Sequence, residues 1–158
     1  MSGYQIADEP RANALTRVAV DPVWPLFGVM FGGAWLAWPW FVLNAIALGS
    51  PTRHREIAVC AGALVGACAL ALAGLAIVAS LPDESRAGAV PYVVLAATVW
   101  KIGSCYALYS LQARTFGIFE YYSRGKVANG LPVVAVGFLL GARFEGSLLG
   151  AFAGLVLG

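Results

Sequence analysis

Charged side chains are scarce in this chain. Of its 158 residues, 10 are Lys or Arg and 8 are Asp or Glu, whereas 60% are apolar. A soluble globular domain carries about 25% charged and about 45–50% apolar residues. A surface that faces water could not be covered at this composition, which argues against a soluble globular domain.

Histidine and cysteine are rare as well. The lone histidine, His54, lies in a predicted loop, so bis-histidine haem ligation, histidine-based zinc sites and Ser-His-Asp catalysis are not available to the chain. Cys60, Cys68 and Cys105 fall inside apolar segments and form no CxxC pair. P-loop, G-x-S-x-G and H-E-x-x-H motifs are absent too. We therefore predict a protein that is not an enzyme and binds no metal or other cofactor.

Long uncharged runs are what the sequence does contain. No charged residue occurs in 22–52 or in 57–82, and each run exceeds the roughly 20 residues that cross about 30 Å of hydrocarbon. Two further apolar segments are interrupted only by one charged residue in the third segment and by two in the fourth. The sequence predicts an all-α membrane protein with a bundle of four transmembrane helices. The N-terminal interfacial tail covers 1–22, and the spans lie at about 23–49, 57–81, 91–112 and 131–158.

The first span is rich in tryptophan around a proline. Trp35, Trp38 and Trp40 lie near its middle beside Pro39, which is expected to kink the helix. Packing of the rings around the kink is the favoured interpretation. The alternative is an aromatic pocket for a ligand or cation.

The third span carries a polar stripe. Its members recur at steps of three and four residues, so they share one helix face: Thr98, Lys101, Cys105, Tyr109 and Gln112. A lysine in the middle of a bilayer costs about 2.5–3.5 kcal/mol on insertion scales. We therefore expect the stripe to face the protein interior or water.

Two charges interrupt the fourth span. If the third and fourth helices are antiparallel, Lys101 and Glu145 both lie near mid-span, and we predict that they pair. Arg143 then needs another partner, such as a lipid phosphate or a carboxylate of a second subunit. A pair that locks helix packing is favoured over one that lines an ion or proton path. A continuous last helix is favoured over a break near Arg143–Glu145 that would make a re-entrant pair.

Glycines recur at four-residue spacing in the second and fourth spans. Such small faces let membrane helices approach closely. The helix-packing candidates are Gly62, Gly66, Gly137, Gly141, Gly146, Gly150 and Gly154. Together with the surplus cation Arg143, these faces predict self-association or a membrane protein partner.

Basic residues gather in the predicted loops 50–56 and 113–130. In the second loop, Arg114, Arg124 and Lys126 alternate with aromatic rings, a mixture typical of a lipid interface with anionic headgroups, and no nucleic-acid partner is expected. The positive-inside rule places both loops in the cytoplasm and both termini outside a bacterial inner membrane.

No substrate signature accompanies this organisation. The leading hypothesis is a small non-enzymatic packing or interaction subunit, or an accessory component of a membrane complex. The alternative is a small oligomeric channel or transporter with a polar path along the third helix.

Overall fold

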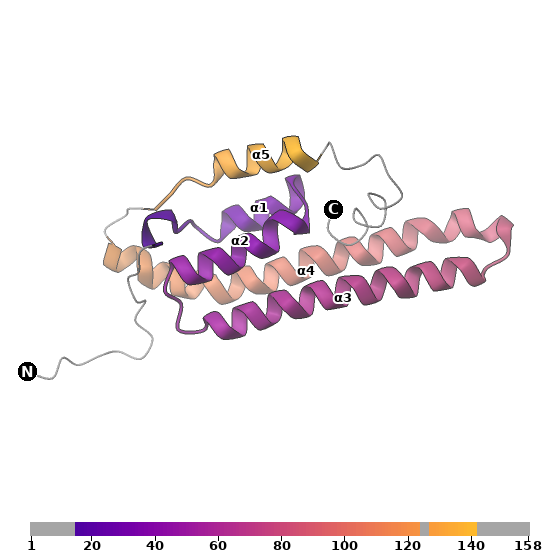
Figure 1. Ribbon diagram of the computed structural model, residues 1–158, viewed down its shortest axis with the longest axis horizontal. Helices are drawn as coiled ribbons and strands as arrows, with labels where there is room; N and C mark the ends of the chain where they lie inside the picture. Colours follow the sequence, from indigo (N-terminus) through magenta and orange to yellow (C-terminus); the bar gives the residue numbers. More distant parts are fainter. Residues whose placement is uncertain (1–14, 124–126, 142–158) are drawn as a thin grey trace, which may run out of the picture.

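Helices dominate the part of the chain that the structure describes. The computed structural model describes residues 15–123 and 127–141, and within these ranges the chain forms five α-helices, one turn of 3-10 helix (η1, Thr16–Val18) and no strand. Helices α3 and α4 form a long antiparallel hairpin, and the shorter α1, α2 and α5 lie against one side of it (Figure 1). The prediction of an all-α protein is confirmed.

The hairpin consists of α3 (Arg53–Ser80) and α4 (Asp83–Ser123). Their 28 and 41 residues correspond to about 42 and 62 Å. Both helices are long and apolar enough to cross a membrane. Helix α4 does not end near 112, where the third predicted span ends, but continues through the first part of the predicted loop 113–130.

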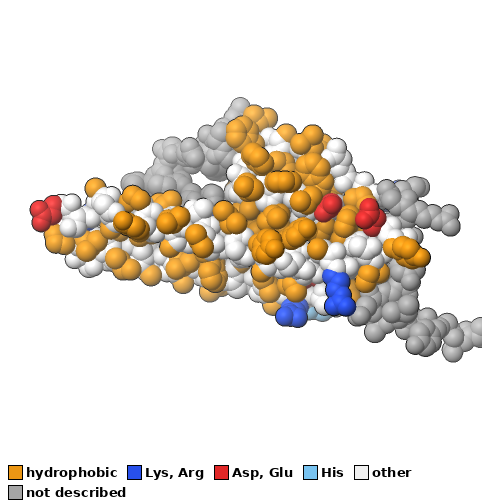
Figure 2. All heavy atoms as spheres, turned by 180° about the vertical axis from the view of Figure 1, so that it is seen from behind, with side chains coloured by type: hydrophobic (Ala, Val, Ile, Leu, Met, Phe, Trp, Pro, Cys, Tyr) orange, Lys and Arg blue, Asp and Glu red, His pale blue; other side chains and the backbone are white. Residues whose placement is uncertain are grey.

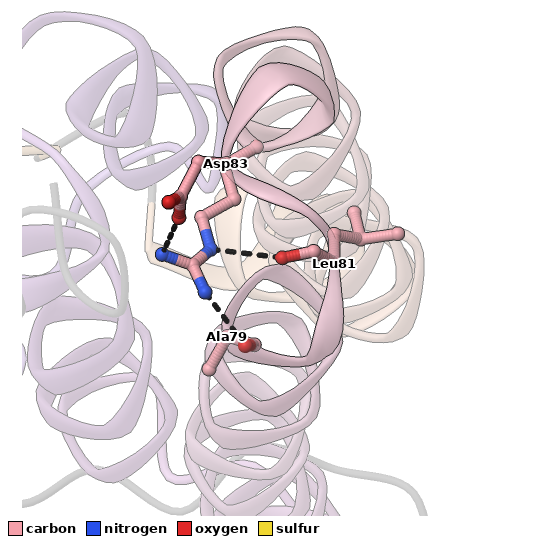
Figure 3. A network of polar contacts seen from close by, with 4 residues as sticks. Ala79, Leu81 and Asp83 are labelled. Carbon is pink, nitrogen blue, oxygen red and sulfur yellow. Dashed lines mark hydrogen bonds and ion pairs between the residues drawn. The ribbon is translucent and has the colours of Figure 1, made fainter.

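The tip of the hairpin, residues 81–86, is closed by an arginine. The Arg86 guanidinium donates Nε–H to the Leu81 carbonyl (3.0 Å) and Nη2–H to the Ala79 carbonyl (3.2 Å), and it forms an ion pair with Asp83 (Figure 3). These carbonyls belong to the end of α3, where backbone acceptors lack helical donors. Asp83 and Glu84 occupy the first turn of α4, where the helix dipole favours negative charge.

The predicted first span is divided into two helices, α1 (Val23–Phe31) and α2 (Ala34–Ala47). Gly33, between them, has φ 88°, a left-handed conformation that glycine adopts without steric cost. With 9 and 14 residues, the helices are about 14 and 21 Å long, too short to cross about 30 Å of hydrocarbon. Pro39 lies inside α2. The prediction of one span over 23–49 with a kink at Pro39 is therefore wrong.

Helices α1 and α2 enter and leave the bundle at the same end. The Val20 amide donates to the Asn44 side chain near the end of α2 (2.9 Å), and Ala19 packs with Leu48 and Phe119. A continuous span would have separated the N-terminal segment from the loop 50–56. The structure brings them together at one end of the helices, which differs from the predicted placement of the two segments on opposite sides of a membrane.

Small residues set the spacing between α3 and α4. A Cβ built on Gly74 would lie 2.3 Å from the Val93 side chain, and one on Gly66 would lie 2.2 Å from the Trp100 ring. The Trp100 indole donates to the Ala63 carbonyl (2.8 Å). Close approach through small residues is how helices associate where no hydrophobic force drives them together.

Helix α5 (Leu131–Gly141) lies beside α1 (Figure 1). The backbone segment that precedes it is tied to the N-terminal segment by a hydrogen bond from Ala128 N–H to the Ala19 carbonyl (2.9 Å). Val134 is buried with Val20 and Trp40. The rest of the fourth predicted span, 142–158, lies outside the described residues.

Candidate functional site

A buried carboxylate lies where α3 begins. Glu56 has no exposed surface. Its Oε1 accepts hydrogen bonds from the hydroxyls of Ser50 (2.5 Å) and Thr52 (2.7 Å), and its Oε2 accepts one from the Gln112 amide (2.8 Å). The first turn of a helix also stabilises an anion through the helix dipole. Both carboxylate oxygens are therefore satisfied.

Two amide side chains extend this contact into a network. Gln112 also donates to the Phe41 carbonyl (2.7 Å) and accepts from the Asn44 amide (3.1 Å), and Asn44 in turn accepts from the Val20 backbone. One chain of hydrogen bonds thus joins the N-terminal segment, α2, the α2–α3 loop, α3 and α4. We call its side chains the polar cluster: Asn44, Ser50, Thr52, Glu56 and Gln112.

The polar cluster can hold helices in register. A buried donor or acceptor left unpaired costs about 1–3 kcal/mol, and more when it is charged, whereas a fully satisfied network makes one arrangement of the core unique. The donors to Glu56 are hydroxyl and amide groups rather than cations. Since both of its oxygens already accept hydrogen bonds, Glu56 is placed as an anchor rather than as a base that meets a substrate.

The predicted polar stripe of α4 lies along the side that α1 and α2 cover. Lys101, Cys105 and Gln112 are buried, and Thr98 and Tyr109 are half-buried. Gln112 joins the polar cluster, whereas the Thr98 hydroxyl donates to the Val94 carbonyl of its own helix (2.8 Å). The stripe is therefore divided between different local partners.

The predicted pair of Lys101 with Glu145 falls partly outside the described residues, as does Arg143, so the pairing stays a prediction. Lys101 itself is 7% exposed. Next to it, the Trp38 indole donates to the Ser104 hydroxyl (3.2 Å), which donates to the Lys101 carbonyl (2.9 Å). Trp38 is thus buried in the helix packing.

The predicted packing glycines differ in their surroundings. Gly66 receives the Trp100 ring, and Gly137 lies against Leu36, whereas a Cβ on Gly62 would meet nothing within 4 Å. Gly141 is the last residue of α5. Gly146, Gly150 and Gly154 lie outside the described residues.

Exposed cations gather at one end of the hairpin. Arg53 and Arg55 lie in the first turn of α3. The hydrogen bond between Glu56 and Gln112 shows that these two positions lie opposite each other in the hairpin, so Arg114 of α4 lies at the same level as Arg53 and Arg55. We call this the basic end. Acidic side chains mark the opposite extremity, the hairpin tip (Figure 2). The other two predicted interface cations, Arg124 and Lys126, lie outside the described residues.

An apolar groove of about 880 Å³ runs between α3 and α4. Most of its lining on α4 lies on the helix face opposite Cys105, whereas Ala63 and Ser104 also pack toward α2. Cβ atoms built on Gly62 or Gly103 would meet nothing within 4 Å. We call it the outer groove; its lining includes Val59, Gly62, Leu70, Tyr92, Gly103 and Ala107.

Most of the polar cluster is not predicted by the sequence pattern. Glu56 follows Arg53, His54 and Arg55, so it belongs to the predicted charged loop 50–56. Asn44 belongs to α2, and the intervening turn hides its relation to Glu56 from any helical periodicity. The available signal was a lone amide within the uncharged run 22–52, because an amide in a membrane segment needs a partner.

The described structure is an all-α protein with two helices that could span a membrane. Within its described parts, no group of three or more His, Cys, Asp or Glu side chains could hold a metal ion. No protein-family model, no curated protein and no solved structure matches the chain.

Proposed function

We propose that this chain is an integral membrane protein whose α3–α4 hairpin crosses the bilayer. One observation carries the proposal. In the most apolar 18 residues of α3 and of α4, only 22% and 17% of the residues are buried. A core helix of a soluble protein would bury most of such a stretch, and large exposed apolar surfaces are not stable in water. Hydrocarbon is the solvent that suits this surface.

The charges suggest how the hairpin is oriented. The basic end carries Arg53, Arg55 and Arg114, and the hairpin tip carries Asp83 and Glu84, with Arg86 occupied by α3 carbonyls. By the positive-inside rule the basic end lies in the cytoplasm of a bacterial cell. Helices α1 and α2 then enter from the cytoplasmic side and return to it. The turn at Gly32–Gly33 is buried, as non-helical backbone within a membrane requires.

The role that fits this arrangement is non-enzymatic packing against another membrane helix, of a second copy or of a larger complex. Helix α3 presents an exposed apolar face in which four of six side chains are alanine, which we call the alanine face: Ala58, Ala61, Val65, Ala69, Leu72 and Ala76. These positions follow steps of three and four residues, so they form one stripe. Small residues at membrane helix faces allow close backbone contact.

Bulkier side chains on the alanine face test this proposal. Chemical cross-linking in intact membranes should trap an adduct of the wild-type chain, and Ala61→Leu with Ala69→Leu should reduce it by at least about fivefold, because overpacking costs 1 kcal/mol or more. Ala135→Leu, at an exposed position of α5, is the matched control and should leave the adduct unchanged. A wild-type chain without any adduct would overturn the packing role.

A channel or transporter with a path along α4 has less support. Gln112 is fully buried and its amide group is used by Phe41, Asn44 and Glu56. A side chain saturated in this way does not line a water-filled path.

A further inference from the structure

We propose that the outer groove binds one acyl chain of an anionic phospholipid, with the lipid phosphate held by Arg55 and Arg114. The groove is lined almost wholly by apolar and small residues, such as Val59, Gly62 and Gly103. Gly62 and Gly103 leave space that no side chain of residues 15–123 and 127–141 fills. The proposal uses the membrane location proposed above but not the alanine face, so the two can fail separately.

The groove is shorter than the hydrocarbon core of a bilayer. Its lining runs from Val59 to Leu70 along α3 and from Tyr92 to Ala107 along α4, which correspond to rises of about 17 and about 22 Å. The whole hydrocarbon core measures about 30 Å. A transmembrane helix from a partner would be expected to contact α3 across both leaflets. An apolar groove that stops short of the full core, with Val59 and Ala107 at its end toward the basic end of the hairpin, suits an acyl chain.

Charge at the mouth of the groove selects the headgroup. Arg55 lies one helical turn before Val59, and Arg114 lies two turns after Ala107, so both are on the helix faces that line the groove. Both arginines are exposed, and the ion pair found among the described residues involves neither of them. Arginine binds phosphate oxygens through paired N–H donors. A lipid with an anionic headgroup therefore complements this site.

The same charges disfavour a second copy as the occupant. Two copies of the chain in one membrane have the same orientation. A two-fold axis along the membrane normal would therefore bring residues at the same membrane depth in the two grooves next to each other. Arg55 and Arg114 of one copy would then face the same residues of the other. Like charges placed together across an interface oppose association, whereas an anionic lipid neutralises them.

Lipid retention tests the site. The protein is reconstituted in nanodiscs of equimolar phosphatidylglycerol and phosphatidylcholine and extracted in mild detergent, and the retained lipid is measured by mass spectrometry. Retention should favour phosphatidylglycerol in the wild type. Each of Arg55→Gln and Arg114→Gln should lower that preference about fivefold. Gly62→Leu with Gly103→Leu should abolish retention of the lipid by filling the groove.

Matched controls separate this site from general surface charge. Arg17→Gln with Arg53→Gln removes two exposed cations of the same end whose side chains lie off the groove, and should keep the preference. Inorganic phosphate should not displace the lipid, since it has no acyl chain. Equal retention of both lipids by the wild type would overturn the proposal. So would an equal loss of the preference in the Arg17→Gln with Arg53→Gln control and in the Arg55→Gln or Arg114→Gln variant, or unchanged retention after the glycine substitutions.

Failure of the membrane proposal would be seen separately. If the lipid preference is absent while the wild-type protein still sediments with membranes and forms its cross-linked adduct, the lipid site alone is wrong. The variant Ala61→Leu with Ala69→Leu should retain phosphatidylglycerol like the wild type, because the alanine face lies beside the groove and not in it.

Discussion

The two halves of the α3–α4 hairpin are held together by different physical means. Near the basic end, α1 and α2 cover the hairpin and the hydrogen bonds of the polar cluster link five segments of the chain. Toward the hairpin tip, α3 and α4 contact each other through glycine and apolar side chains. The first half depends on exact polar pairing, whereas the second depends on close packing and on an apolar surrounding.

The largest loss of stability is expected from Glu56→Ala. It would leave the Ser50 hydroxyl and one donor of Gln112 without their acceptor in a buried site, and it would remove the partner of the exposed Thr52 hydroxyl. At about 1–3 kcal/mol for each of the two unpaired buried groups, the loss should be about 2 kcal/mol or more. Thermal unfolding in detergent would show it. Glu120→Ala, at an exposed position of α4, should leave the transition in place; an equal shift in both variants would contradict the role of the cluster.

A smaller loss is expected at the turn between α1 and α2. Gly33→Ala forces a Cβ into the left-handed conformation with φ 88°, at a cost of about 1–2 kcal/mol. The control is Gly88→Ala in α4, where a Cβ would meet nothing within 4 Å and alanine favours the helix. Unfolding of the two variants should shift in opposite directions, and equal stability would argue against the turn at Gly33.

Near the middle of α3, two glycines one turn apart should behave differently. Gly66→Ala would bring a Cβ against the Trp100 ring, while Gly62→Ala enters open space. Overpacking costs about 1–3 kcal/mol where neighbours cannot move; the indole hydrogen bond to Ala63 limits that movement. A stability difference of about 1 kcal/mol between the variants is expected in the same unfolding assay. If both were neutral, Trp100 would not be packed on Gly66.

The smallest effect is expected at the hairpin tip. Arg86→Ala removes one ion pair and two hydrogen bonds to carbonyls of α3. The Arg86 and Asp83 side chains are 46% and 90% exposed, so solvent screens them and the loss should stay within about 1 kcal/mol. If Arg86→Ala lowered the stability as much as Glu56→Ala, the tip would depend on polar pairing as strongly as the basic end does.

Sequence patterns predicted some elements well because their physical cause is local. The uncharged run 57–82 sets a long helix, and α3 occupies it with one extra turn at its start. Pro39 attracted the prediction of a kink, yet the interruption lies at Gly32–Gly33. The reason is that a proline costs a helix one hydrogen bond and can remain inside it, whereas the left-handed residue at Gly33 ends the helix and reverses the chain.

The candidate sites were less accessible from the sequence. Gln112 was selected through its place on a polar stripe, but its partners Asn44 and Glu56 come from other helices. Such contacts depend on tertiary packing, which helical periodicity does not encode. The outer groove is likewise formed by two helices together, and its glycines Gly62 and Gly103 are far apart in the chain.

Labelling from the two sides of the membrane tests the hairpin crossing most directly. Three single substitutions, Val18→Cys, His54→Cys and Glu84→Cys, place a thiol at exposed positions of η1, of the basic end and of the hairpin tip. A membrane-impermeant maleimide applied to intact cells should label only the Glu84→Cys protein. After the cells are opened, the Val18→Cys and His54→Cys proteins should both be labelled as well. Labelling of positions 54 and 84 from the same side would contradict a hairpin that spans the bilayer.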